Sequence, residues 1–254
     1  MLAEGSGPPV LLLHGSGPGT TAAAWAPLIA ALAPRHRVIA PDLLGFGSSP
    51  KPEPGQSLRS AWTAQALEIV DSLALESFAV VGNSAGGAIA LSLACARPGV
   101  VSRVVAVGSM GLAMALPAGL DALWSYGPPS EAAARALTEL INYDPAAATP
   151  EAVAARLKAT LAQPWYPELF PAPRQRWVDD LALAPAELAA IAVPVLLVHG
   201  AQDRIVPLRD SFLGLLEALP DARGHVFGRC GHASPLEHTG EFNRLLTTFL
   251  ETDR

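Results

Sequence analysis

Short apolar runs alternate along the chain with longer segments whose apolar residues recur at helical spacing. The apolar runs predict strands at Val10–His14, Arg37–Pro41, Phe78–Gly82, Arg103–Gly108, Val195–His199 and Gly224–Phe227. The segments between them predict helices at Trp25–Ala33, Ala61–Leu73, Gly86–Ala96, Leu208–Leu219 and Glu241–Glu251. Strands that alternate with helices in this way form a parallel sheet covered on both faces. The pattern therefore predicts an α/β fold with a doubly wound, mostly parallel sheet.

Residues 112–190 interrupt this alternation. They contain helical patterns at 131–142, 151–162 and 174–183, separated by prolines, and no convincing strand. All three tyrosines and three of the five tryptophans fall in this segment. We expect a helical lid over a pocket, inserted into a core made of residues 1–111 and 191–254. The alternative is an ordinary helical subdomain that uses its aromatic residues as core.

The composition suits a well-packed globular enzyme. Of the 254 residues, 50% are hydrophobic and 16% are charged, which argues against disorder. No apolar run approaches the roughly 18 residues of a membrane-spanning helix, and the N-terminus lacks the pattern of a signal peptide. We therefore expect a cytoplasmic protein that is not bound to a membrane. The net charge of −6 disfavours nucleic acid as a partner, because such surfaces need clustered Lys and Arg.

The two cysteines do not indicate a metal site or a disulfide framework. Cys95 lies in an apolar helical pattern, and Cys230 lies near a candidate catalytic histidine without a cysteine-nucleophile pattern around it. We expect structural roles for both residues.

The segment around Ser84 carries the clearest chemical signal. An apolar strand leads into Gly82-Asn-Ser84-Ala-Gly86, and an apolar helix follows at once. This is the G-x-S-x-G nucleophile elbow, whose tight turn needs small flanking residues and presents the serine hydroxyl at a helix N-terminus. Ser84 is the predicted nucleophile. We expect an oxyanion hole from the N–H groups of Ala85 and of Ser16, which lies in the glycine-rich loop after the first strand.

The candidate base and acid lie in loops that follow predicted strands. His232 lies in a glycine-flanked loop after the last strand, whereas the other five histidines end strands or lie in turns, a strand or a helix start. Asp203 follows the strand before it, so the order Ser, acid, His of this fold is kept. Asp203 would orient the imidazole without taking its proton. Asp210 is a weaker candidate because it falls in the following predicted helix.

These motifs resemble those of the α/β-hydrolase superfamily, from about Val10 to Leu250. The resemblance narrows to the meta-cleavage product hydrolases, particularly those that process 2-hydroxymuconate semialdehyde-type compounds. It rests on segments spread over the chain: His14–Gly19, Gly82–Gly87, Gly108–Gly111, Gly119–Tyr126, Asn142–Pro145 and Glu241–Leu245. The resemblance implies hydrolysis of a carbon–carbon bond in a vinylogous diketone from aromatic ring fission. It implies a small-molecule substrate with a carboxylate, no cofactor and no metal, and it is compatible with a homo-oligomer.

The resemblance also assigns substrate contacts. Asn83 matches an asparagine near the enol and carboxylate end of the substrate, and Arg156 matches a lid arginine that binds the carboxylate; a solvent-facing helix charge is the alternative for Arg156. Gly15, Trp124 and Tyr143 are further candidates for the pocket, with core packing as the alternative for the two aromatic residues.

The chain departs from the family at two places. Ala233 follows the catalytic histidine where the family usually has Trp, which would enlarge the pocket or remove a contact at the dienoate end. The chain also starts directly before the first predicted strand, where relatives have an extra pair of strands. Two explanations stay open: the sheet is shorter, or the given sequence starts late.

Two other functions use the same parts. A carboxylesterase or lactonase needs only the triad and the oxyanion hole, so Asn83 and Arg156 would then be incidental. A non-catalytic ligand receptor is a further use of this fold, and the intact triad argues against it. A dehalogenase or epoxide hydrolase is disfavoured, because those enzymes carry Asp at the position of Ser84.

Overall fold

The computed structural model describes residues 1–252 of the chain. In chain order, its elements are β1 (Leu2–Glu4), β2 (Pro9–Leu13), η1 (Ala22–Trp25), α1 (Ala26–Leu32), β3 (Arg37–Ala40), α2 (Leu58–Ser72), β4 (Phe78–Asn83), α3 (Ala85–Ala96), β5 (Val101–Val107), α4 (Ala118–Trp124), α5 (Glu131–Ile141), η2 (Pro145–Ala147), α6 (Pro150–Leu161), η3 (Tyr166–Glu168), α7 (Gln175–Leu181), α8 (Pro185–Ala189), β6 (Val195–Gly200), α9 (Phe212–Ala218), β7 (Ala222–Phe227), α10 (Ser234–Glu237) and α11 (Thr239–Glu251).

A seven-stranded sheet forms the centre of the molecule, in the order β1-β3-β2-β4-β5-β6-β7. All neighbouring strands are parallel except β1, which pairs antiparallel with β3. The six predicted strands are therefore present, and the predicted doubly wound sheet is confirmed. Because the strands are parallel, the loops after β2, β4, β5, β6 and β7 all emerge at one edge of the sheet.

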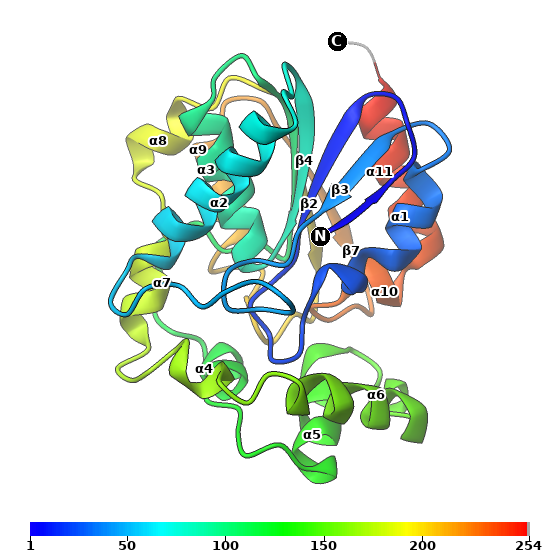
Figure 1. Ribbon diagram of the computed structural model, residues 1–254, viewed down its shortest axis with the longest axis vertical. Coiled ribbons are helices and arrows are strands. Elements are labelled where there is room, and N and C mark those ends of the chain that lie inside the picture. The colour runs from blue at the N-terminus through cyan, green and yellow to red at the C-terminus, as the bar shows by residue number, and fades with distance from the viewer. Residues whose placement is uncertain (253–254) are drawn as a thin grey trace.

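Two apolar clusters lie on the two faces of the sheet. One contains inward residues of α2 and α3, such as Trp62 and Ile89, together with residues from the insertion. The other contains inward residues of α1 and α11, such as Leu28 and Phe242. Figure 1 shows α2 and α3 on one side of the strands and α1 and α11 on the other. The residues of β4 are buried except for the partly buried Asn83 at its end, so the central strand holds the following turn on a rigid support.

The predicted helical insertion lies between β5 and β6. Helices α4, α5 and α6 lie beyond the end of the sheet (Figure 1), whereas α7 contacts α2 and α3, and α8 contacts α3 and α9. Apart from the exposed Tyr143, the aromatic residues of the insertion belong to the large core cluster or pack against it, so the insertion packs on the core as well as on itself. We propose that residues 112–190 form a lid on the core. Within this segment, α7 and α8 attach the lid to the core helices.

Some elements differ from the sequence prediction. The chain begins with a short strand, β1, that the pattern does not show because its three residues are all exposed. Helix α9 begins at Phe212, since residues 208–211 form a turn, and this leaves Asp210 outside the helix. Helices α4, α8 and α10 were also not predicted; α8 and α10 are short and α4 lies in a proline-rich stretch.

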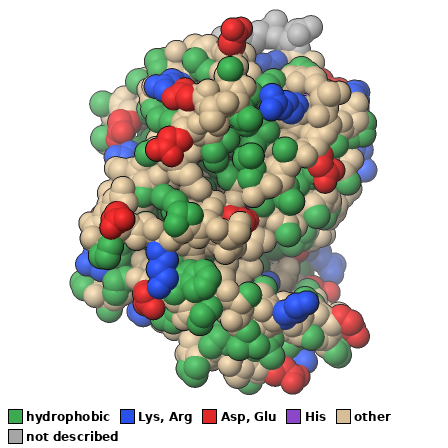
Figure 2. Space-filling model, viewed as in Figure 1, with side chains coloured by type: hydrophobic (Ala, Val, Ile, Leu, Met, Phe, Trp, Pro, Cys, Tyr) green, Lys and Arg blue, Asp and Glu red, His purple; other side chains and the backbone are tan. Residues whose placement is uncertain are grey.

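The surface shows no division by charge on the face seen in Figure 2, where acidic and basic side chains are interspersed among apolar ones. Among residues 1–252, no helix has the length and apolar character needed to cross a membrane.

Candidate active site

Ser84 lies on the turn between β4 and α3 in a strained conformation. Its φ of 56° and ψ of −120° fall in a region that side chains other than glycine rarely adopt, at a cost of about 1–3 kcal/mol. The neighbouring glycines make the turn possible. A Cβ on Gly82 would lie 2.0 Å from the oxygen of Gly86, and one on Gly86 would lie 2.3 Å from the oxygen of Leu13. The close approach explains why the motif needs glycine at both positions.

The two predicted oxyanion-hole donors are free. Among residues 1–252, the backbone N–H groups of Ser16 and Ala85 have no hydrogen-bond acceptor. Buried backbone N–H groups are normally paired, so two free ones beside the serine turn are available to an anion. The Gly15 loop lies against that turn, because a Cβ on Gly15 would lie 3.1 Å from the Cβ of Ser84.

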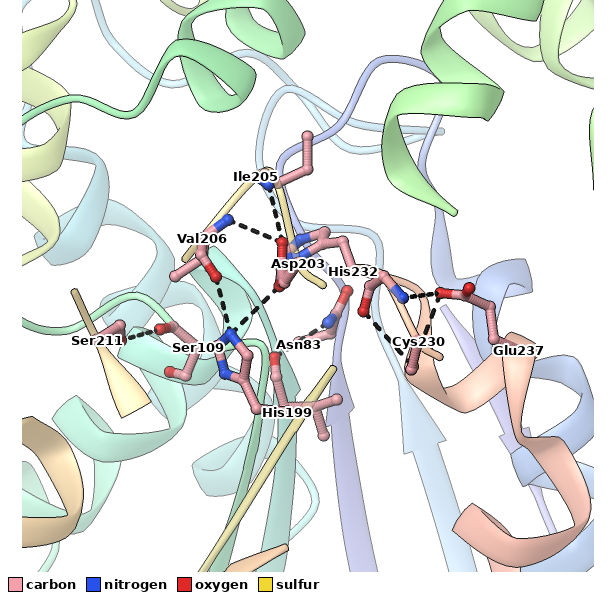
Figure 3. Close-up of polar contacts among 12 residues, drawn as sticks. Asn83, Ser109, His199, Asp203, Ile205, Val206, Ser211, Cys230, His232 and Glu237 are labelled. Carbon is pink, nitrogen blue, oxygen red and sulfur yellow. Dashed lines mark hydrogen bonds and ion pairs between the residues drawn. The ribbon is translucent and has the colours of Figure 1, made fainter. Parts of the chain in front are cut away.

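His232 and Asp203 form a buried hydrogen-bonded pair. The Nδ1–H of His232 donates to Oδ2 of Asp203 at 2.7 Å. Figure 3 shows Asp203 among its polar neighbours, with Ile205, Val206 and His199 around the carboxylate. The other oxygen, Oδ1, accepts from the N–H groups of Ile205 at 2.8 Å and Val206 at 2.9 Å. Burial alone would raise the pKa of Asp203. The interactions with His232, together with smaller ones from His199 and the Val206 N–H, outweigh burial and lower the pKa of Asp203 from 3.8. The carboxylate stays ionised, so it orients the imidazole with Nε2 free to accept a proton.

Gly108 brings the serine and the histidine into one neighbourhood. The N–H of Ser84 donates to the oxygen of Val107 at 2.8 Å, and Gly108 follows directly. A Cβ on Gly108 would lie 3.1 Å from Nδ1 of His232 and 3.3 Å from Oδ2 of Asp203. The ends of β4 and β5 and the loops after β6 and β7 thus meet at one edge of the sheet.

His199 contacts the acid, which the sequence did not reveal. Its Nε2 lies 2.8 Å from the oxygen of Val206 and 3.4 Å from Oδ2 of Asp203. Burial is the main cause that lowers the pKa of His199, so the ring is neutral at neutral pH and donates its Nε2–H. In the sequence, His199 ends a predicted strand four residues before Asp203, and this spacing is the signal that indicates the contact.

Asn83 and Ala233 line a small cavity beside this group. The cavity has a volume of about 60 Å³ and is also bordered by His14 and Gly15. The side-chain amide of Asn83 donates to the oxygen of Val107 at 3.0 Å, and a Cβ on Gly15 would lie 3.3 Å from its Oδ1. That oxygen is therefore turned toward the loop that carries Ser16.

Arg156 lies on α6 of the insertion and is partly buried. Its Nε donates to Oγ1 of Thr138 at 2.8 Å, while its two terminal nitrogens have no acceptor among residues 1–252. Burial lowers the pKa of Arg156 from 12.5 without removing its charge at neutral pH. Helix α6 lies against the Gly15–Gly19 loop, because a Cβ on Gly19 would lie 2.9 Å from that of Ala159, one turn from Arg156. No hydrogen bond joins Arg156 to Asn83 or Ser84 within that part of the chain.

The two aromatic candidates lie in different places. Trp124 is fully buried and stacks on Phe170, and its Nε1–H donates to Oγ of Ser16 at 2.9 Å. It therefore helps to hold the loop that carries Ser16. Tyr143 is 38% exposed and its ring lies against Arg229 in a surface groove that also contains His238. The structure thus gives no contact that supports a pocket role for the Tyr143 side chain.

Tyr166 is a residue of the site that the sequence did not single out. Its hydroxyl donates to the oxygen of Ser16 at 2.9 Å and contacts that of Leu123 at 3.2 Å. Burial raises the pKa of Tyr166 well above its usual value, so the hydroxyl stays a donor. Two residues of the insertion therefore fix the loop of the proposed oxyanion hole.

The cysteines offer no second nucleophile. Cys230 is buried with its thiol near Glu237, and burial is the main cause that raises its pKa. Burial likewise raises the pKa of the Cys95 thiol, which donates to the oxygen of Glu187. Within residues 1–252, no group of His, Cys, Asp and Glu side chains is arranged to hold a metal ion.

Comparison with known proteins agrees with the geometry. The profile of the alpha/beta hydrolase fold family matches residues 8–239. The chain belongs to this family. A 2-hydroxymuconate semialdehyde hydrolase of Pseudomonas sp. (strain CF600) is 43% identical over 252 residues, covering 97% of this chain and 88% of the relative. Within the α/β hydrolases, the chain is therefore a member of the meta-cleavage product hydrolases.

Two solved structures are similar over nearly the whole chain. One is the meta-cleavage product hydrolase of Pseudomonas fluorescens IP01, solved as a serine-to-alanine mutant with acetates. Its TM-score is 0.93 and its sequence identity is 39%, and the match covers 98% of this chain and 92% of that one. The 2-hydroxy-6-oxo-6-phenylhexa-2,4-dienoate hydrolase from Rhodococcus sp. strain RHA1 has a TM-score of 0.87 and 34% identity, with 99% of this chain and 94% of that one covered. The predicted α/β-hydrolase fold and serine-dependent hydrolase are confirmed.

Proposed function

We propose that this chain hydrolyses a carbon–carbon bond in a ring-fission product of the 2-hydroxy-6-oxohexa-2,4-dienoate type. Ser84 is the nucleophile, His232 the base and Asp203 the acid that orients it. The observation that carries this proposal is the buried His232–Asp203 pair, held beside the strained serine turn. The names of its relatives, 2-hydroxymuconate semialdehyde hydrolase and 2-hydroxy-6-oxo-2,4-heptadienoate hydrolase, support the substrate class.

The proposed reaction has two stages. The bound dienol is first converted to its keto form, which places an electron sink next to the bond to be broken. The Ser84 hydroxyl then loses its proton to Nε2 of His232 while its oxygen bonds to the exposed ketone carbon. The N–H groups of Ser16 and Ala85 stabilise the oxyanion. The carbon–carbon bond breaks, its electron pair passes to the dienoate fragment, and His232 returns the proton. Water, deprotonated by His232, then hydrolyses the ester on Ser84.

The substrate carboxylate is the group that Arg156 would hold. Its unpaired terminal nitrogens can make the two parallel hydrogen bonds that a carboxylate accepts. Thr138 fixes Nε, so the guanidinium is oriented before the anion arrives. Asn83, at the foot of the serine turn, would contact the enol end of the same molecule.

Replacing the nucleophile tests the enzyme assignment. Ser84→Ala should lower kcat on a 2-hydroxy-6-oxohexa-2,4-dienoate by at least about a thousandfold and leave the ligand Kd largely unchanged, because triad members act as a unit. Ser92→Ala is a matched control, since Ser92 lies on the adjacent helix with its hydroxyl bonded to Ala88. Turnover by Ser84→Ala close to that of the control would refute the proposal.

A second comparison separates the carbon–carbon hydrolase from an esterase or lactonase. Arg156→Ala should raise KM strongly for the ring-fission dienoate and change hydrolysis of a neutral p-nitrophenyl ester little. Arg135→Ala, which removes another lid arginine that bonds the oxygen of Ala148, is the control. An equal loss on both substrates would favour a structural role for Arg156, and turnover of the ester alone would favour the esterase.

We further propose the cytoplasm as the location of the protein and a homo-oligomer as its state, and we expect no nucleic-acid partner. Sedimentation velocity and a filter-binding assay with DNA and RNA test the last two.

A further inference from the structure

The loop that carries His232 lies against the carboxyl end of lid helix α5. The backbone N–H of His232 donates to the oxygen of Ile141 at 2.7 Å. The backbone of Gly231 approaches the same lid segment, because a Cβ on Gly231 would lie 2.5 Å from the oxygen of Ile141 and 2.8 Å from the nitrogen of Tyr143. The proposed base is therefore held at a contact between two segments that lie far apart in the chain.

The carboxylate of Glu237 bridges the two sides of this contact. Its Oε1 accepts the N–H of Gly231 at 2.9 Å, and its Oε2 accepts the N–H of Tyr143 at 2.7 Å. Figure 3 shows the Glu237 side chain directed toward Cys230, in the segment that leads to His232. An ionised carboxylate has two acceptor oxygens and no donor, so one Glu237 side chain can join two N–H groups from different segments.

The surroundings of Glu237 distinguish a positioning role from a role in stability. Glu237 ends the short helix α10, is half-buried, and borders a surface groove together with Tyr143. Water can enter such a groove and can bond to the two N–H groups if the carboxylate is absent. Water does not fix the distance between the two segments, however. The bridge by Glu237 therefore contributes geometry that solvent cannot replace.

The lid end of the bridge has a second attachment to the core. Arg204, which follows Asp203 directly, donates to the oxygen of Asn142 at 2.9 Å. The last carbonyl groups of a helix need partners outside it, and here the acid loop supplies one of them. The end of α5 therefore stays attached to the core without Glu237, whereas the loop of His232 loses one of its ties to the lid.

We propose that Glu237 is a positioning residue for the reaction. Its carboxylate fixes the loop of His232 to the lid, so that Nε2 is held where it can take the proton of Ser84. The proposal rests on the proposed function only for the roles of Ser84 and His232, and it applies equally to cleavage of an ester. Without the bridge, the loop keeps the bond from the His232 N–H to Ile141 and spends less time in the reactive position.

Glu237→Gln tests the bridge while keeping the size of the side chain. The amide has one acceptor oxygen, and its NH₂ group would face an N–H group, so one charge-assisted hydrogen bond is lost. We expect kcat to fall about tenfold on the ring-fission dienoate and on a p-nitrophenyl ester alike, with KM for the dienoate little changed. Glu237→Ala loses both bonds and should show at least as large a fall. Glu241→Gln is the matched control, since Glu241 is exposed on α11, and it should leave kcat unchanged.

The kinetics of fluorophosphonate labelling separate positioning from folding. The final extent of labelling counts folded molecules, and the rate constant reports how well His232 activates Ser84. We expect the rate constant of Glu237→Gln to fall by the same factor as kcat, while the extent stays that of Glu241→Gln. A lower extent at an unaltered rate constant would show a merely structural role and overturn the proposal. Equal kcat in the two variants, or a raised KM for the dienoate at unchanged kcat, would also overturn it. Turnover of the ester but not of the dienoate by the unaltered chain would instead refute the proposed function, and the labelling rate constants would still decide the role of Glu237.

Discussion

Replacing Asp203 by Asn tests how the acid supports the histidine. In the native chain Oδ1 accepts two backbone N–H groups, and Oδ2 accepts the Nδ1–H of His232. An asparagine offers one oxygen and one NH₂ group. If the oxygen stays on the backbone donors, the NH₂ group faces Nδ1 of His232. The imidazole must then carry its proton on Nε2, which can no longer accept a proton from Ser84.

The magnitude follows from this reversal of the tautomer. We expect Asp203→Asn to lower kcat about 10⁴-fold, which corresponds to about 5 kcal/mol of activation free energy. The loss in folding stability should be smaller, about 1–3 kcal/mol, because two of the hydrogen bonds remain and one charge-assisted bond is lost. A large kinetic effect with a small effect on stability is the pattern expected of an orienting residue.

The assay is single-turnover kinetics on the ring-fission dienoate together with urea titration of each variant. Asp210→Asn serves as the control, since Asp210 is exposed in the next turn and was the weaker candidate for the acid. A fall in kcat of less than tenfold in a folded Asp203→Asn variant would refute the role given to Asp203. Loss of folding with equal loss of activity would show a structural residue.

Three further predictions concern Trp124, Gly82 and His14. Trp124→Phe keeps the stacked ring but removes the N–H that reaches Ser16, so kcat should fall about tenfold in steady-state kinetics; an unchanged kcat would contradict a positioning role. Gly82→Ala introduces a Cβ 2.0 Å from a backbone oxygen and should lower Tm strongly in calorimetry, whereas Gly228→Ala, whose Cβ meets nothing within 4 Å, should change it little; equal shifts would contradict the steric argument. The pKa of His14 is lowered from 6.5 to about 4, so its contribution to stability is complete above pH 6.5 and is lost as pH falls toward 4, by up to about 3 kcal/mol. Urea titrations should show that the free energy of unfolding falls less between pH 7 and pH 4.5 in His14→Gln than in the unaltered chain. An equal fall in both proteins would contradict this role of His14.

The parts of the site that sequence predicts are those set by local pattern. The turn at Ser84 is readable because an apolar strand, two obligatory glycines and an apolar helix adjoin along the chain. Asp203 and His232 are readable because parallel strands deliver their following loops to one edge.

Contacts between distant side chains could not be predicted. The bond from Trp124 to Ser16, 108 residues apart, depends on packing, and an aromatic residue in the sequence fits a core role equally well. A resemblance alone does not say where a side chain points, and the ring of Tyr143 lies against Arg229 in a surface groove. Strand β1 was missed because three exposed residues carry no hydrophobic alternation.

The central claim is that Ser84 is an activated nucleophile, and covalent labelling tests it most directly. The chain is treated with a fluorophosphonate, digested and analysed by mass spectrometry, alongside Ser84→Ala and Ser92→Ala. The account predicts one adduct on Ser84 in the unaltered chain and in Ser92→Ala, and none in Ser84→Ala. An unlabelled chain, or an adduct that persists in Ser84→Ala, would contradict it.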